Sequence, residues 1–203
     1  MDNIYWRIRK ARAEDEAFCL TCYQQASKNF AYQGIDQWQD NYPNASTFRK
    51  DLSEGNSYIL EIILGDKIET VGTMYFAMSQ DLGYEGNNEH IWSNNLPYGV
   101  IHRIALADEF KEKGLSLCFF CYAARQAHRA DISMFRIDTH RDNQIMQSLL
   151  QRLGFQNRGA IYFAREDSGV YIQRMAYDQW TESILHNLQS WSWLYKEIQE
   201  EIT

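Results

Sequence analysis

The sequence predicts one α/β or α+β domain, built on a mixed β-sheet with helices on its faces. The chain has 203 residues, of which 45% are hydrophobic, with 2 prolines and 11 glycines, a composition typical of one compact domain. Segments with strand-like alternation also interchange with segments of helical periodicity. No segment is apolar over the length of a bilayer, and the N-terminus lacks the pattern of a signal peptide. We therefore expect a cytoplasmic protein that does not bind membranes.

Five segments among the first 78 residues have the periodicity of regular secondary structure. They are the predicted strand 5–10, the helices 13–30 and 46–54, and the strands 57–64 and 67–78. Asn44 or Ser46 is expected to cap the second helix, and Gly55 follows its end. Only Gly65 and Asp66 separate the two later strands, which predicts a hairpin with a two-residue turn.

Residues 79–97 show no periodicity and predict a long loop. A loop of this length in a compact domain is usually functional or mobile. Its acidic and aromatic residues, with two aromatic residues from an earlier loop, suggest a lip that binds a cationic amine by charge and ring stacking. These residues are Asp81, Tyr84, Glu85, Glu89, Trp92, Trp38 and Tyr42. The alternative is an ordinary solvated loop in which a few aromatic side chains pack.

The remaining segments complete the predicted domain, which we assign to residues 1–177, and add a terminal helix. The predicted strands are 98–106, 134–140, 160–164 and 170–176, and the helices are 114–129 and 143–153. Residues 178–203 then predict one amphipathic helix, because apolar residues recur at alternating steps of four and three. These residues are Ile184, Leu188, Trp191, Tyr195, Ile198 and Ile202. The helix is expected to pack on the domain or on a partner subunit, the second arrangement giving a homodimer.

The charge and the cysteines exclude several classes of function. A formal net charge of −7 argues against broad binding of nucleic acid or of anionic lipid, and it is compatible with a cationic small substrate. The cysteines form two Cys-x-x-Cys pairs, Cys19/Cys22 and Cys118/Cys121, both inside predicted helices without the glycine-rich turns of metal knuckles. We predict buried thiols in the core, no metal site and no disulfide framework.

The segment from the predicted strand 98–106 to the helix after it has the properties of an anion site. A buried strand, a basic turn with Gly114 and a helix N-terminus direct free amides and the helix dipole toward one place. The spacing in Lys111-Glu-Lys-Gly-Leu-Ser116 differs from that of a Walker loop. Glycine also simply permits a sharp turn, so the turn alone leaves both readings open.

A second segment makes the pattern more specific. Residues 137–143 end a strand and open a helix, and that helix ends at Gly154 before Phe155. Together with Lys111–Ser116, this block resembles the GNAT superfamily of acyl-CoA-dependent N-acyltransferases. The loop corresponds to the family pattern Gln/Arg-x-x-Gly-x-Gly/Ala, and Asn143 through Phe155 corresponds to the block Asn-x-x-Ala-x-x-Leu-Tyr-x-x-x-Gly-Phe, which is the more specific of the two. The resemblance covers about Tyr5 to Tyr177 and implies a mostly antiparallel central sheet with helices on both faces.

The resemblance implies acetyl-CoA as co-substrate, with the pyrophosphate on the loop amides and the pantetheine arm along the preceding strand. The corresponding residues are Ile104, Ala105 and Leu106 in the strand, Lys111, Glu112, Lys113, Gly114, Leu115 and Ser116 in the loop, and Asn143 at the next helix. Lys111 and Ser116 depart from the family pattern, but a charge and a hydroxyl donor remain available to phosphate. Leu150 stands where many members have a tyrosine that protonates the leaving thiolate.

His102 is the first candidate for a catalytic base. It lies two residues before Ile104 and on a regular strand shares a face with Ile104 and Leu106. The alternative is a structural histidine on a half-buried strand. Tyr162 can replace the missing acid, or it can be a core or interface residue. His140 can serve as a base or as a helix cap, and capping is favoured.

These observations lead to three hypotheses about function. The first is an N-acetyltransferase that transfers an acetyl group from acetyl-CoA to a primary amine, on a small molecule or a peptide, by direct attack in a ternary complex. The alternative is a non-catalytic acyl-CoA-binding or protein-interaction module on the same fold, which Leu150, Ser116 and the terminal apolar stripe favour. The third is the same fold with a decayed cofactor site. The amine acceptor and the oligomeric state stay open.

Overall fold

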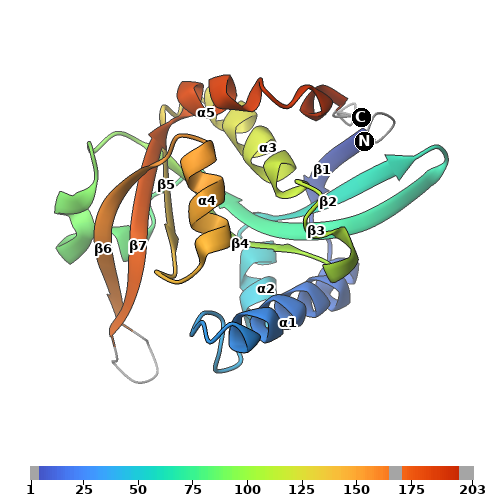
Figure 1. Ribbon diagram of the computed structural model, residues 1–203, viewed down its shortest axis with the longest axis horizontal. Coiled ribbons are helices and arrows are strands. Elements are labelled where there is room, and N and C mark those ends of the chain that lie inside the picture. The colour runs from blue at the N-terminus through green and yellow to red at the C-terminus, as the bar shows by residue number, and fades with distance from the viewer. Residues whose placement is uncertain (1–4, 165–170, 197–203) are drawn as a thin grey trace. The chain divides into compact units, whose positions relative to one another are not determined.

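The computed structural model describes residues 5–164 and 171–196, and it contains one mixed sheet with five α-helices (Figure 1). The strands are β1 Tyr5–Lys10, β2 Ser57–Leu64, β3 Lys67–Ala77, β4 Tyr98–Leu106, β5 Met134–Thr139, β6 Gln156–Ala164 and β7 Tyr171–Trp180. The helices are α1 Glu16–Tyr32, α2 Ala45–Ser53, α3 Ser116–Arg129, α4 Gln144–Arg152 and α5 Thr181–Leu188. The strand order is β1-β2-β3-β4-β5-β7-β6. The predicted mixed sheet is confirmed.

The described residues group into two compact units. The first contains the described parts of 1–76, 102–123 and 188–203, and the second contains those of 77–101 and 124–187. Strand β4 contributes to both, because its residues 98–101 belong to the second unit and 102–106 to the first.

The first unit contains the predicted hairpin. β2 and β3 pair antiparallel, with Leu64 opposite Lys67 across the predicted Gly-Asp turn. Of the two expected caps, Asn44 is the one that caps α2, since its side-chain oxygen accepts hydrogen bonds from the N–H groups of Ser46, at 2.9 Å, and Thr47, at 3.2 Å.

The four cysteines lie in this unit and are buried as free thiols, as predicted for core residues. Cys19 and Cys22 pack in a cluster with Tyr23, Phe48, Ile59 and Ala105. Burial raises the pKa of Cys19 and of Cys22 to about 12. These two thiols therefore behave as small apolar groups.

A group of charged side chains ties β1 to β2 and to the start of α1. The Glu61 carboxylate accepts from Arg7 at 2.5 Å and from Arg9 at 2.8 Å, and Arg9 also forms two 2.8 Å bonds to Asp15. Burial favours the neutral form of Glu61, but the two arginines outweigh it, so the pKa of Glu61 is lowered. The carboxylate is nearly buried and fully partnered, which makes it a stabilising element of the hairpin.

The second unit contains β5, β7 and β6, which pair antiparallel, and the long loop before β4. β6 begins four residues before the predicted strand 160–164, because Gln156 pairs with Asp178 across a bulge between Asn157 and Gly159. Residues 156–159 are mostly polar, so the sequence there lacks the alternation of apolar and polar residues that predicts a strand. In this extension Arg158 of β6 donates a 2.7 Å hydrogen bond to the buried Asp178 of β7, so the two opposite charges neutralise each other.

Among the aromatic residues of the suggested amine-binding lip, Tyr84 and Trp92 are buried and Trp38 is partly buried, whereas Tyr42 is exposed. Tyr84 is fully buried and donates its hydroxyl hydrogen to Asp138 at 2.7 Å, and the Trp92 indole N–H donates to the Tyr84 carbonyl at 3.0 Å. In the first unit, Trp38 packs edge-on against Tyr23. The rings of Tyr84, Trp92 and Trp38 therefore pack inside the protein. For residues 79–97, the structure favours an ordinary loop with packed aromatic side chains over an amine-binding lip.

The predicted helix 178–203 is wrong in its start and in its continuity. β7 runs through Trp180, which pairs with Met134 of β5, so the pairing of the sheet overrides helical periodicity up to that residue. In the described part of this segment, which ends at residue 196, the α-helix α5 covers Thr181–Leu188, and the short 3-10 helix Ser192–Lys196 follows after a break.

The apolar stripe of this segment is partly buried by the chain itself. Ile184 and Leu188 are buried, and Leu194, outside the predicted stripe, is buried with them. Ile198 and Ile202 lie outside the described residues. The homodimer stays a prediction. Among the helices of the described residues, none combines the length and the hydrophobicity needed to cross a membrane.

We predict that Glu61→Gln lowers the free energy of unfolding by about 1–3 kcal/mol at pH 7, because Arg7 and Arg9 lose the charge they share. Thermal denaturation from pH 7 to pH 3 measures it. The folded pKa of Glu61 is lowered, so its stabilisation is present above the pKa of the unfolded carboxyl group. That stabilisation is lost as the pH falls through the folded pKa, so the gap between wild type and variant should begin to narrow below about pH 4.

The matched control is Glu69→Gln in the same hairpin, where Glu69 pairs with the exposed Lys67. Its effect should stay within about 0.5 kcal/mol. Equal destabilisation by both substitutions would contradict the role assigned to Glu61.

Candidate functional site

The candidate site begins where β4 stops pairing with β5. The parallel register joins only Tyr98–Val100 to Met134–Arg136. The backbone from Ile101 to Leu106 is therefore not paired with β5 in the described residues, and this stretch includes the predicted cofactor contacts Ile104, Ala105 and Leu106. Unpaired strand backbone can accept an extended ligand as an added strand.

The turn between β4 and α3 presents a row of free amide donors. In the described part of the chain, the N–H groups of Glu112, Lys113, Gly114, Leu115 and Ser116 have no hydrogen-bond acceptor. Glu112 and Gly114 both have left-handed backbone, with φ of 61° and 74°. The α3 helix that follows is 14 residues long, so its dipole favours an anion at this end. These donors fit a phosphate or pyrophosphate group.

Unlike the backbone amides of the turn, its lysine side chains already have hydrogen-bond partners. The Lys111 ammonium pairs with Asp108, and the Lys113 ammonium donates to the Glu109 carbonyl at 2.6 Å. Leu115 points into the core and is only 2% exposed. The lysine charges are therefore partly engaged within the turn, and the backbone amides are its most available donors.

Beside His102, β4 carries a buried ion pair that sequence reasoning missed. The Arg103 guanidinium donates two 2.8 Å hydrogen bonds to the Asp51 carboxylate of α2 and a third, at 3.1 Å, to the Tyr42 hydroxyl. The guanidinium also lies over the Tyr75 ring, 4.5 Å from its centroid. Burial raises the pKa of Asp51, and the charge of Arg103 opposes that rise. An arginine within an apolar strand was the available signal, since such a charge needs a partner.

Arg103 also interrupts the regular alternation of β4. Its φ is 51°, a left-handed conformation that is uncommon outside glycine. The shared face of His102, Ile104 and Leu106 was inferred from strict alternation, and that alternation does not hold through Arg103. His102 itself is partly exposed, with its ring 5.8 Å from the Tyr75 ring. It belongs to the same unit as the amide-rich turn.

The other predicted site residues belong to the second unit. Asn143 is buried and caps α4, because its side-chain oxygen accepts from the Met146 N–H at 3.1 Å. Tyr162 lies on β6, is half exposed, and accepts a hydrogen bond from Gln173 at 3.2 Å. Leu150 is fully buried, so the position of the family's tyrosine is part of the core here.

His140 does not cap α4, because Asn143 holds that position and His140 contacts the backbone before the helix. Its Nδ1 accepts a hydrogen bond from the backbone N–H of Asp142 at 3.2 Å, just before α4 begins. No group of three or more His, Cys, Asp or Glu side chains in the described residues is arranged to hold a metal ion.

The structure is similar to solved acetyltransferases. A GNAT-family acetyltransferase from Streptococcus agalactiae is 25% identical with a TM-score of 0.69, and the match covers 86% of this chain and 95% of that one. The chain has the GNAT fold. A GNAT-family acetyltransferase from Listeria monocytogenes matches with 15% identity and a TM-score of 0.62, over 86% of this chain and 94% of that one. No family model and no curated protein matches the sequence.

A further GNAT-fold match was solved with a ligand. YncA from Salmonella typhimurium, solved with its cofactor acetyl-CoA, is 13% identical with a TM-score of 0.57, over 87% of this chain and 94% of that one. The GNAT fold confirms the resemblance that the sequence motifs indicated, and the neighbours support acetyltransferase activity in general.

We predict that Asp51→Asn destabilises the protein by about 3–5 kcal/mol, because it leaves the Arg103 guanidinium buried without a counter-charge. Thermal or urea denaturation measures the change. The double variant Asp51→Asn/Arg103→Met should recover part of the loss. The control is Glu16→Gln, which removes the partner of the exposed Arg49 on the same α2 helix. An unchanged melting temperature for Asp51→Asn would refute the assignment.

Proposed function

We propose that this protein is an N-acetyltransferase that transfers an acetyl group from acetyl-CoA to a primary amine. The observation that carries the proposal is the row of amides at the start of α3 that have no acceptor among the described residues, next to strand backbone that is not paired with β5 there. The GNAT fold of the chain and the acetyl-CoA in the YncA structure support it. The amine belongs to a small molecule or a peptide, and the protein acts in the cytoplasm.

The residues present fit the cofactor. The amides of Glu112–Ser116 would hold the pyrophosphate, and the backbone of Ile104–Leu106 would hold the pantetheine arm. Lys111 would add positive charge beside the phosphates. Asn143 is proposed to bind the arm, although its side chain already caps α4. Bound acetyl-CoA supplies an activated acyl carbonyl and a thiol leaving group.

In this mechanism His102 accepts the proton of the attacking amine, directly or through water. An alkyl amine has a pKa near 10.4, so at neutral pH it is almost entirely protonated, which amounts to roughly 4 kcal/mol of barrier. The N–C bond forms, the C–S bond breaks, and the amine proton passes to His102. The leaving sulfur takes a proton from Tyr162 or from solvent, because the buried Leu150 has none to give.

A non-catalytic acyl-CoA-binding or interaction module remains the second candidate. Leu150 favours it, since its side chain is fully buried and replaces the acid that many family members use. This candidate has the same cofactor contacts and differs by having no turnover. A homodimer formed through the C-terminal segment is compatible with either candidate.

Acetyl-CoA at a hundred times its dissociation constant should stabilise the protein by about 2.7 kcal/mol, or roughly 5–10 °C in melting temperature. Free CoA is the comparison ligand. Gly114→Ala strains a left-handed position in the turn and should weaken acetyl-CoA binding roughly tenfold. Gly65→Ala is the matched control, because Gly65 is also left-handed, with φ of 61°, but lies in the hairpin turn. No shift of the wild type at saturating ligand would overturn the proposal.

His102→Ala should lower kcat at neutral pH by about a hundredfold or more, with little change in the KM for acetyl-CoA. The loss should shrink as the pH approaches the pKa of the amine, because free amine then needs no base. Steady-state thiol release with a panel of amines measures this. His128→Ala, at an exposed position of α3, is the control. Equal turnover of wild type and His102→Ala would remove His102 from the mechanism, and binding without turnover would favour the second candidate.

A further inference from the structure

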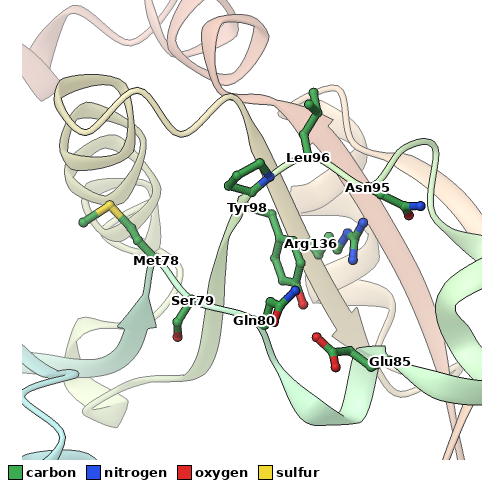
Figure 2. Close-up of a pocket in the computed structure, with 9 residues that line it drawn as sticks. Met78, Ser79, Gln80, Glu85, Asn95, Leu96, Tyr98 and Arg136 are labelled. Carbon is green, nitrogen blue, oxygen red and sulfur yellow. The ribbon is translucent and has the colours of Figure 1, made fainter.

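The second unit contains a cavity of about 450 Å³ that the acetyl-transfer proposal does not use (Figure 2). It lies between the end of β3, the start of β4 and β5. Its lining includes Met78, Leu96, Pro97, Tyr98, Glu85 and Arg136. A cavity of this size accommodates a small organic molecule.

The cavity wall contains a buried guanidinium group. Arg136 is only 6% exposed, and its guanidinium carbon lies 4.0 Å from the ring centroid of Tyr98 and 4.8 Å from that of Trp92. One nitrogen donates to the Asn94 carbonyl at 2.5 Å. Figure 2 shows the guanidinium beside the Tyr98 ring. Two rings and a carbonyl thus hold this planar donor in a fixed orientation.

Among the residues that the structure describes, Arg136 has no carboxylate partner of its own. The described residues form no ion pair with Arg136. The charge of Asp178 acts on Arg136 from nearby, but the Asp178 carboxylate already accepts hydrogen bonds from Arg158 at 2.7 Å and from the Ser93 N–H at 2.9 Å. Burial lowers the pKa of Arg136, because desolvation is the largest effect on it. A buried cation without a direct counter-charge favours an anionic ligand, and a carboxylate matches the guanidinium fork.

The other residues that line the cavity indicate which further groups the ligand contains. Glu85 contributes a carboxylate to the same cavity, which favours a cationic group in the ligand. Met78, Leu96 and Pro97 supply apolar surface. We propose that this cavity binds a free α-amino acid with an apolar side chain, its carboxylate on Arg136 and its ammonium group on Glu85.

Three probes that share one carbon skeleton test the proposal on the full chain by isothermal titration calorimetry. L-Leucine has both charges, L-leucinamide lacks the carboxylate, and 4-methylpentanoate lacks the ammonium group. L-Leucine should bind most tightly and L-leucinamide most weakly, because leucinamide leaves Arg136 unpaired. Failure of both L-leucine and 4-methylpentanoate to bind, or equal affinity for all three probes, would overturn the proposal. The outcome is independent of acetyl-CoA, so the cofactor proposal stands or falls separately.

Two variants locate the site. Arg136→Met should weaken L-leucine binding by about tenfold to a hundredfold, whereas Arg141→Met, at an exposed arginine, should not. Glu85→Gln should bring L-leucine and 4-methylpentanoate to similar affinities, and Glu182→Gln, at an exposed glutamate, is its control. If Arg136→Met does not fold, Glu85→Gln alone decides. Binding that is unchanged in Glu85→Gln, or in a folded Arg136→Met, refutes this site.

Discussion

The ion pair between Arg103 and Asp51 is the interaction on which the candidate site depends. Left-handed backbone at a non-glycine residue costs about 1–2 kcal/mol and persists only where the surroundings enforce it. The two hydrogen bonds from Arg103 to Asp51 provide that enforcement, because they fasten β4 to the buried face of α2. His102 and Ile104 flank the constrained residue, so their positions follow from this pair.

Arg103 and Arg136, two arginines with mostly buried side chains, illustrate how burial and function can diverge. Arg103 is matched by a carboxylate, a hydroxyl and a ring, which together satisfy most of its donors. Arg136 has rings on its flanks and one carbonyl, but no paired acid among the described residues. A paired buried charge fixes local structure, while an unpaired one retains the capacity to bind. The same residue type therefore plays opposite parts in the two units.

Local signals in the sequence predicted the parts of the fold that local forces determine. The bounds of β4, the Gly-Asp hairpin and the Asn44 cap all follow from short-range geometry, and all three were predicted from a few adjacent residues. The family resemblance also came from contiguous motifs around Gly114 and Asn143. The extension of β7 through Trp180 and the partner of Arg103 depend on residues about fifty positions away, and periodicity contains no information about them. That no described acid pairs with Arg136 was equally inaccessible, because it depends on which acidic side chains the fold places near that arginine.

The buried thiols have a consequence for how the molecule can be studied. All 4 cysteines of the chain fall within the first unit, and the second unit has none. The pKa of Cys19 and Cys22, raised to about 12, keeps them protonated and slow to react while the core is closed. Alkylation at these sulfurs therefore reports the transient opening of one unit alone, with no signal from the other. The rate of cysteine alkylation therefore measures local unfolding of the first unit, which also contains the amide-rich turn.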